Sequence, residues 1–204
     1  MEKRRRLARQ ISNLAAPPQM ALPIYFLAAW YDYDHHSPAV PAFLLAIAAA
    51  VFFGGVFPII FVLAMLSRHQ VTDIFISVRQ QRTIPYLVTI FGFLAGFGAV
   101  YGLIGPSALA AIMFTNALTT VVLTIINLYW KMSGHAIGVA GPVAVLTVFY
   151  GWVAAPFYLL IPVVSWARVT IKAHTPGQVI AGSIFGYGFT LAQLLIIFRP
   201  LGWL

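Results

Sequence analysis

The 204-residue chain is 61% hydrophobic and only 8% charged, with a mean hydropathy of +0.92, which excludes an ordinary soluble domain. Its formal net charge of +8 does not indicate a nucleic-acid-binding protein, because the basic residues lie at the ends of apolar segments. The absence of cysteine excludes disulfides and thiol catalysis. The composition therefore predicts an integral membrane protein.

A basic stretch opens the chain, and apolar segments follow it in close succession. We expect residues 1–13 to form a basic, membrane-proximal N-terminus and residues 14–204 to form a single transmembrane domain. A spanning helix needs about 20 mainly apolar residues. Apolar segments cover residues 14–31, 40–66, 85–104, 109–129, 136–151, 153–164 and 179–198. The predicted fold class is therefore all-α, a polytopic transmembrane bundle of six or seven helices.

Two places in this pattern leave alternatives open. Pro17 and Pro18 interrupt the first segment, which is then either a kinked span or an interfacial helix. Near Gly151 the chain either turns or continues as one long helix. Pro156, Pro162 and the excess length favour a turn.

Glycines recur at four-residue spacing within several segments. These are Gly92, Gly96, Gly98, Gly102, Gly134, Gly138, Gly182 and Gly186. Such spacing lets helix backbones approach closely in lipid. We expect packing within one bundle rather than a dedicated dimer face, and the oligomeric state stays open. The run D-Y-D-H-H at 32–36 is expected to be a solvated turn rather than a metal site.

Three polar islands separate the later apolar segments, at residues 67–82, 130–135 and 166–178. Two apolar segments lie between successive islands, so we expect all three at the same membrane face. Polar residues at a membrane edge are costly and mark function. Cations can neutralise a phosphate dianion, while one histidine attacks phosphorus and another protonates the departing alkoxide. The islands therefore indicate phosphate chemistry.

The second and third islands carry motifs that resemble the type 2 phosphatidic acid phosphatase superfamily. That family has three short motifs, K-x6-R-P, P-S-G-H and S-R-x5-H-x3-D. The run K-M-S-G-H at 131–135 resembles the second motif, and R-V-T-I-K-A-H at 168–174 reproduces the R-x5-H of the third. The match in order and spacing extends over residues 73–178.

This resemblance implies a lipid-phosphate phosphatase that acts through a phosphohistidine intermediate. His174 is the implied nucleophile, and His135 the implied proton donor to the leaving group. Ser133, Gly134 and Arg168 are implied to bind phosphate oxygens. The resemblance implies no metal and no other cofactor. The expected partners are membrane lipids and the lipid phosphate substrate, and no nucleic acid.

The first motif survives only in part. It is reduced to R-Q-Q-R-T-I-P at 79–85, with no lysine seven residues before either arginine. We assign Arg79 and Arg82 to the phosphate and expect Lys131 to supply the missing cation.

The third motif departs at the family's aspartate, which is Gln178 here. An aspartate in that place orients the nucleophilic imidazole and stabilises its charge, and losing such a partner costs about 10⁴-fold in rate in the serine-protease triad. Gln178 can accept the Nδ1 proton of His174 through its amide oxygen. Alternatively, Asp73 reaches His174 from the first island, and we prefer this second hypothesis.

The side of the membrane depends on the first segment. If residues 14–31 span, eleven of the twelve Lys and Arg share the active face and only Arg199 lies opposite. The positive-inside rule then predicts the cytoplasmic face of the plasma (cell inner) membrane. If the segment lies on the surface, the active face is extracytoplasmic.

The predicted activity is hydrolysis of a phospholipid or polyprenyl phosphate or diphosphate. The sequence does not choose among these substrates. Two alternatives are phosphotransfer to another alcohol through the same intermediate and a noncatalytic phospholipid-binding relative. A transporter is a more remote alternative.

Overall fold

The computed structural model describes residues 2–204, and this part of the chain contains helices and connecting loops but no β-strand. The helices are α1 (Glu2–Leu14), α2 (Pro17–His36), α3 (Val40–Val51), the π-helix η1 (Phe52–Val56), α4 (Phe57–Ser67), the 3₁₀-helix η2 (Arg79–Arg82), α5 (Thr83–Ile104), α6 (Ala108–Tyr129), α7 (Gly134–Tyr150), the 3₁₀-helix η3 (Gly151–Leu159), α8 (Leu160–Thr170), α9 (Pro176–Ala192) and the π-helix η4 (Gln193–Phe198). The predicted all-α class is confirmed.

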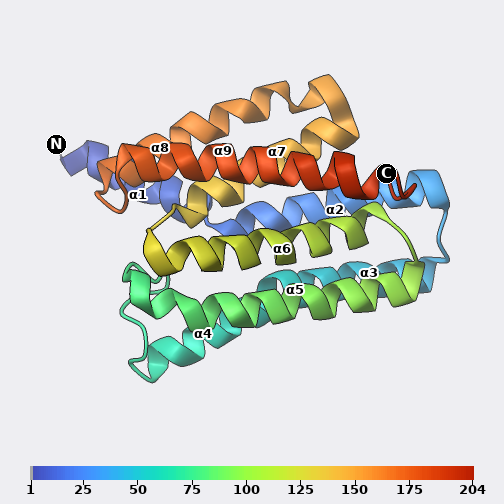
Figure 1. Cartoon of the computed structure of the whole chain (residues 1–204), viewed down its shortest axis with the longest axis horizontal. Coiled ribbons are helices and arrows are strands. Elements are labelled where there is room, and N and C mark those ends of the chain that lie inside the picture. The colour runs from blue at the N-terminus through green and yellow to red at the C-terminus, as the bar shows by residue number, and fades with distance from the viewer. Residues whose placement is uncertain (1) are drawn as a thin grey trace.

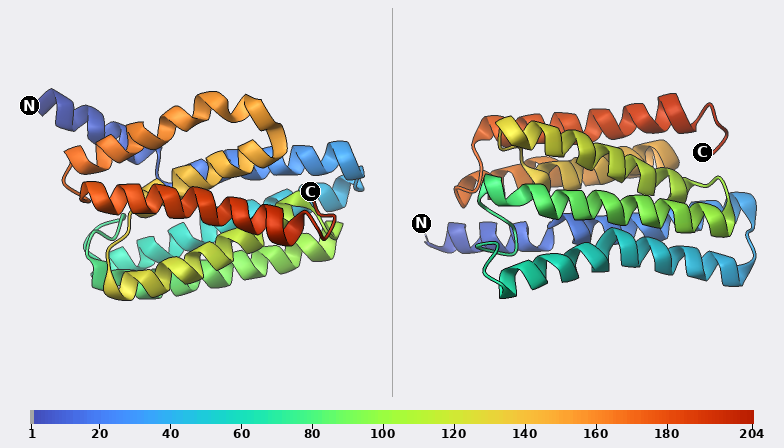
Figure 2. Two further views of the ribbon diagram at one scale, coloured as in Figure 1. Left: turned by 45° about the horizontal axis from the view of Figure 1, so that its top comes forward. Right: turned by 60° about the horizontal axis from the view of Figure 1, so that its bottom comes forward.

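The long helices lie side by side along the longest axis of the molecule, and α1 projects from one end (Figure 1). The further views in Figure 2 show the same lengthwise arrangement. Five helical runs are long and apolar enough to cross a membrane, and they are Val40–Ser67, Arg79–Ile104, Ala108–Tyr129, Gly134–Thr170 and Pro176–Phe198. The chain is therefore a helical membrane protein.

The run Gly134–Thr170 is not one straight rod, because the chain turns back at Gly151. This residue ends α7 with a φ of +57°, which glycine adopts without a steric penalty. Helix α8 then packs against α7 as the second arm of a hairpin (Figure 1). The predicted turn is confirmed.

The interrupted first segment becomes two helices. Helix α1 ends at Leu14, and Pro17 and Pro18 occupy the first turn of α2, where proline is tolerated because the N–H groups have no helical partner. Helix α2 runs along the bundle, but Asp32 and Asp34 near its end make it less apolar than the five runs above. The count of six or seven spans stays a prediction.

The run at 32–36 forms the last turns of α2 rather than a separate turn. Residues 33–36 are exposed, as predicted, but the prediction was wrong for Asp32, which is only 1% exposed. The Asp32 carboxylate accepts hydrogen bonds from the backbone N–H groups of Ala108 and Leu109, at 2.6 and 2.9 Å. These N–H groups begin α6 and have no partner within the helix, so the carboxylate caps α6 and complements its dipole.

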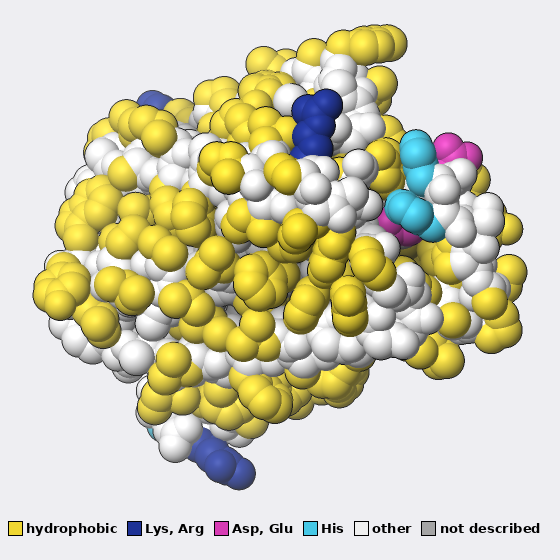
Figure 3. Space-filling view, turned by 45° about the vertical axis from the view of Figure 1, so that its right-hand side comes forward, with side chains coloured by type: hydrophobic (Ala, Val, Ile, Leu, Met, Phe, Trp, Pro, Cys, Tyr) yellow, Lys and Arg dark blue, Asp and Glu magenta, His cyan; other side chains and the backbone are white. Residues whose placement is uncertain are grey.

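The outer surface of the bundle suits lipid. Large hydrophobic side chains are exposed along the helices, among them Phe26, Leu44, Phe91, Ile125 and Ile184. Figure 3 shows a surface covered largely by hydrophobic side chains, with few charged side chains among them. This distribution agrees with helices whose sides face hydrocarbon and whose ends face water.

Helices α7 and α9 approach closely because glycines face the contact. A Cβ added at Gly186 would lie 2.7 Å from the Cα of Ile137, and one at Gly182 would lie 2.9 Å from the carbonyl oxygen of Ser133. Packing within the bundle is therefore confirmed for these two glycines. It does not hold for Gly98, where a Cβ would have nothing within 4 Å.

We predict that Gly186→Ala destabilises the protein by about 1–3 kcal/mol, because the added methyl group meets the backbone of α7. The midpoint of thermal denaturation in detergent, scanned at one fixed rate, should fall by several degrees. Gly188→Ala is the matched control on the same helix, because a Cβ there has nothing within 4 Å. Equal midpoints for the two variants would contradict the prediction.

Candidate functional site

The three polar islands lie together at one end of the bundle, as predicted (Figures 1 and 2). Each island sends side chains into a single cavity. The first contributes Arg82, the second Gly134 and His135, and the third Arg168 and His174. The structure thus joins the two histidines and two of the predicted arginines in one site.

His174 is positioned by the start of α9. Thr175 is the N-cap, Pro176 is the first helical residue, and Gln178 completes a capping box. The Gln178 side-chain oxygen accepts a hydrogen bond from the Thr175 backbone N–H at 3.2 Å and lies 3.1 Å from Nδ1 of His174. Because the Thr175 N–H donates to it, the Gln178 atom next to His174 is the amide oxygen, which can only accept. Nδ1 of His174 therefore carries the proton, and Nε2 keeps its lone pair.

His135 lies in the first turn of α7, which Ser133 caps. The Ser133 hydroxyl accepts from the Ala136 N–H at 3.3 Å, and Ser133 itself is fully buried. Its predicted contact with phosphate is therefore replaced by a capping role, whereas the neighbouring Gly134 lines the cavity. Within the described residues, Nε2 of His135 is buried without a hydrogen-bond partner, which leaves it available to a ligand.

Two arginines are almost completely buried beside these histidines. Arg82 and Arg168 are each 4% exposed. Arg82 donates from Nε to the Ile76 carbonyl at 2.8 Å, and Arg168 donates from Nη1 to the Ser12 hydroxyl at 2.7 Å. Ser12 belongs to α1, so the N-terminal helix holds one of the site's cations. Ser12 was not predicted as a site residue, because the basic charges are the only signal in residues 1–13 of the sequence.

The cations of the site have no carboxylate partner in the described part of the chain. The acid–base contacts in residues 2–204 join only Asp34 to His35 and Asp32 to His36, in the last turns of α2. A buried charge without an opposite charge costs several kcal/mol. The site therefore has an excess of positive charge that suits an anion.

This positive charge also acts on His174. Burial, and then the charges of Arg168, Arg82 and Lys131, lower the pKa of His174 to about 3. Lys131 donates from Nζ to the Ala173 carbonyl at 3.0 Å, and burial and the same two arginines lower its pKa too. His174 is thus neutral at pH 7, with an unprotonated Nε2.

Arg79, which was assigned to the phosphate, does not line the cavity. Its guanidinium donates to the carbonyl oxygens of Asn127, at 2.8 Å, and Leu128 at the end of α6. The Asn127 amide donates back to the Arg79 carbonyl at 3.2 Å. These carbonyls have no partner within the helix, so Arg79 caps α6.

Asp73, the preferred acid partner of His174, is engaged elsewhere. Its carboxylate accepts from the backbone N–H groups of Phe75 at 2.9 Å and Ser77 at 3.0 Å, and so holds its own loop in shape. Gln178 already bonds Nδ1 of His174. The geometry therefore supports Gln178, the other alternative, as the orienting group.

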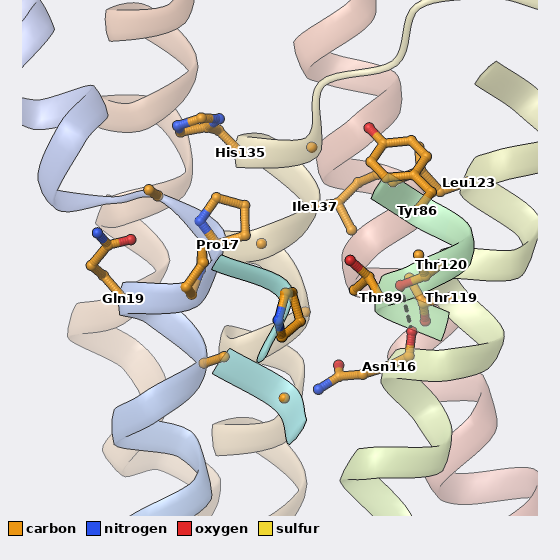
Figure 4. Close-up of a pocket in the computed structure, with 18 of the residues that line it drawn as sticks. Pro17, Gln19, Tyr86, Thr89, Asn116, Thr119, Thr120, Leu123, His135 and Ile137 are labelled. Atoms are coloured by element: carbon orange, nitrogen blue, oxygen red, sulfur yellow. Dashed lines mark hydrogen bonds between the residues drawn. The ribbon is translucent and has the colours of Figure 1, made fainter. Parts of the chain in front are cut away.

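The cavity extends from the charged end into the bundle and has a volume of about 370 Å³. Figure 4 shows His135 toward one end and Asn116 toward the other, with Pro17 and Gln19 on one side and Thr89 on the opposite side. Its walls come from α2, α4, α5, α6 and α7. The charged end of the cavity is thus continuous with its apolar interior.

No protein-family model, no curated protein and no solved structure matches this chain. No group of three or more His, Asp or Glu that could hold a metal ion occurs among residues 2–204.

We predict that His174 stays neutral far below its ordinary pKa of 6.5. In the folded protein, ¹⁵N-histidine NMR should record an Nδ1–H imidazole at pH 5, with His174→Ala identifying the signal. The unfolded chain takes up this proton near pH 6.5 and the folded chain only near pH 3, so stability falls as the pH is lowered through that window. A titration midpoint near 6.5 would contradict this.

Proposed function

We propose that this protein is a membrane lipid-phosphate phosphatase that works through a phosphohistidine at His174. The observation that carries the proposal is a pair of buried arginines, Arg82 and Arg168, which line one cavity with two histidines and form no salt bridge to a carboxylate of residues 2–204. A phosphate group supplies the charge that these cations need, and guanidinium groups match its geometry.

In the first step, Nε2 of His174 attacks phosphorus and the bond from phosphorus to the lipid oxygen breaks. The departing oxygen takes a proton from His135, whose cationic form is favoured by the negative charge of the bound phosphate. In the second step, water attacks the phosphohistidine, His135 accepts a proton from that water, and the bond to His174 breaks. The products from a lipid monophosphate are the lipid alcohol and inorganic phosphate, and those from a diphosphate are the lipid monophosphate and inorganic phosphate.

Gln178 contributes orientation to this mechanism but no charge. Its amide oxygen keeps the proton on Nδ1, so Nε2 is the attacking atom. The positive charge that develops on the imidazole is offset by the bound phosphate rather than by an acid. Lys131 adds to the charge of the pocket, although it does not line the cavity.

The proposed substrate is a phospholipid or polyprenyl phosphate or diphosphate, because the charged end of the cavity continues into an apolar interior. The N-terminus lies at the same end as the site (Figure 1). By the positive-inside rule we propose that this end faces the cytoplasm at the plasma (cell inner) membrane.

The test is phosphate release from a panel of lipid phosphates in detergent with EDTA. We expect the wild type to release phosphate, His174→Ala to lose activity by at least about 10³-fold, and His135→Ala by about 10²- to 10⁴-fold. A noncatalytic phospholipid-binding role, suggested by Gln178 in place of the family's aspartate, predicts no release and binding that survives His174→Ala. Unchanged turnover in His174→Ala would refute the phosphohistidine.

A second prediction separates the two orienting groups. Gln178→Ala should lower turnover by about tenfold or more, because Nδ1 of His174 loses its acceptor. Loss of a hydrogen-bond partner that orients a functional histidine typically has an effect of about this size. Asp73→Asn should change turnover by less than about threefold, since its carboxylate bonds only its own loop. The opposite ranking would restore Asp73 as the partner of His174.

A further inference from the structure

The cavity extends well beyond the groups that act on phosphate, and we propose that it holds one hydrocarbon chain of the substrate inside the helical bundle. The preferred substrate then carries a single chain of about a dozen carbons. This inference rests on the proposed function for the identity of the head group. The chain site itself is argued from the walls, depth and volume of the cavity.

The depth of the cavity places its far end inside the membrane. Asn116 lines it and lies about 20 Å from the end of α6 that faces the site, at 1.5 Å per residue. Ile112 and Phe93 line the cavity as well, and both are buried in the main hydrophobic cluster. A molecule that reaches them from the charged end must therefore pass into the core of the bundle.

The walls are more apolar than their residue names indicate. Thr89 donates its hydroxyl to the Pro85 carbonyl at 2.8 Å, and Thr120 donates to the Asn116 carbonyl at 2.7 Å. Bonds of this kind to the preceding turn occupy the hydroxyl proton and leave the methyl group as a surface. Thr119 is likewise engaged, since it accepts from the Gln193 amide at 3.1 Å. A chain fits these walls better than a polar solute or an ion.

The volume limits what the cavity can hold. A water-sized group takes about 30 Å³, which is also close to the size of a methylene group, so 370 Å³ holds roughly twelve such groups in all, of which the phosphate at the charged end takes a small share. One medium-length chain with its head group fills this space. A second chain of the same length would need about twice this volume, so we place it outside the cavity.

The lining also offers a route from the bilayer. Gln19 of α2 and Ile74 of the loop after α4 both line the cavity and are exposed, so the cavity reaches the outer surface near its charged end. Ile59 and Val62 of α4 continue the same wall. A lipid can therefore place its head group at Arg82 and Arg168 while its chain enters from the side.

The experiment measures phosphate release from n-alkyl phosphates of about 8 to 18 carbons, a range on both sides of the roughly twelve that the cavity volume allows. The substrates are presented in phosphatidylcholine nanodiscs, so that no detergent chain competes. We expect an optimum near twelve carbons, and didodecanoyl phosphatidate should be hydrolysed at least about tenfold more slowly than dodecyl phosphate. Activity that is independent of chain length, or equal rates for the two lipids, would overturn the inference.

Variants locate the chain. Asn116→Phe adds bulk deep in the cavity and should move the optimum to shorter chains. Thr120→Leu is a milder change at a lining position and should move it in the same direction. Ile125→Phe is the control on the same helix, because this side chain is 54% exposed and does not line the cavity. A shift in the control equal to that of Asn116→Phe would place the chain elsewhere.

A binding measurement separates this inference from the proposed function. If the wild type releases no phosphate from any probe, the proposed function fails. The thermal midpoint of His174→Ala is then measured with dodecyl phosphate, with octadecyl phosphate and with inorganic phosphate. Stabilisation that peaks with dodecyl phosphate and is lost in His174→Ala/Asn116→Phe supports the chain site, and stabilisation independent of the chain overturns it.

Discussion

The site depends on one electrostatic constraint, which is that two buried guanidinium groups share one end of the bundle and form no salt bridge within residues 2–204. Helix packing brings these groups together from η2 and α8, and α1 holds one of them through Ser12. Burial of such charges is unfavourable by itself. The close contact of α7 with α9 and the hairpin at Gly151 place Arg168 beside His135 and His174 at this end.

Burial and then the same charges set the chemical state of His174. A buried histidine surrounded by cations stays neutral, and the amide of Gln178 fixes which nitrogen holds the proton. An aspartate at that place would partly neutralise the pocket and raise the affinity of the imidazole for a proton. Glutamine therefore keeps two properties together, an imidazole with an unprotonated Nε2 and a pocket with its full positive charge.

Much of the fold could be predicted from the sequence. Apolar segments long enough to span a membrane are recognised from their composition, and proline and glycine mark turns such as the one at Gly151. The grouping of His135, Arg168 and His174 followed from the number of segments between the islands. The roles of Arg79 and Asp73 could not be predicted, since each residue has several partners within reach. Arg79 bonds a carbonyl of α6 that lies 48 residues further along the chain, and no local sequence pattern indicates such a contact.

Helix α6 is held at both ends by side chains from other parts of the chain, with Asp32 on its first N–H groups and Arg79 on its last carbonyl groups. Apolar contacts in lipid allow helices to slide along one another at little cost, whereas directional bonds at both ends fix the axial register. Because α6 carries the deep wall of the cavity, this register keeps that wall at a constant depth below His135 and His174. A hydrocarbon chain bound as proposed would therefore meet a cavity of fixed length rather than one that adapts to it.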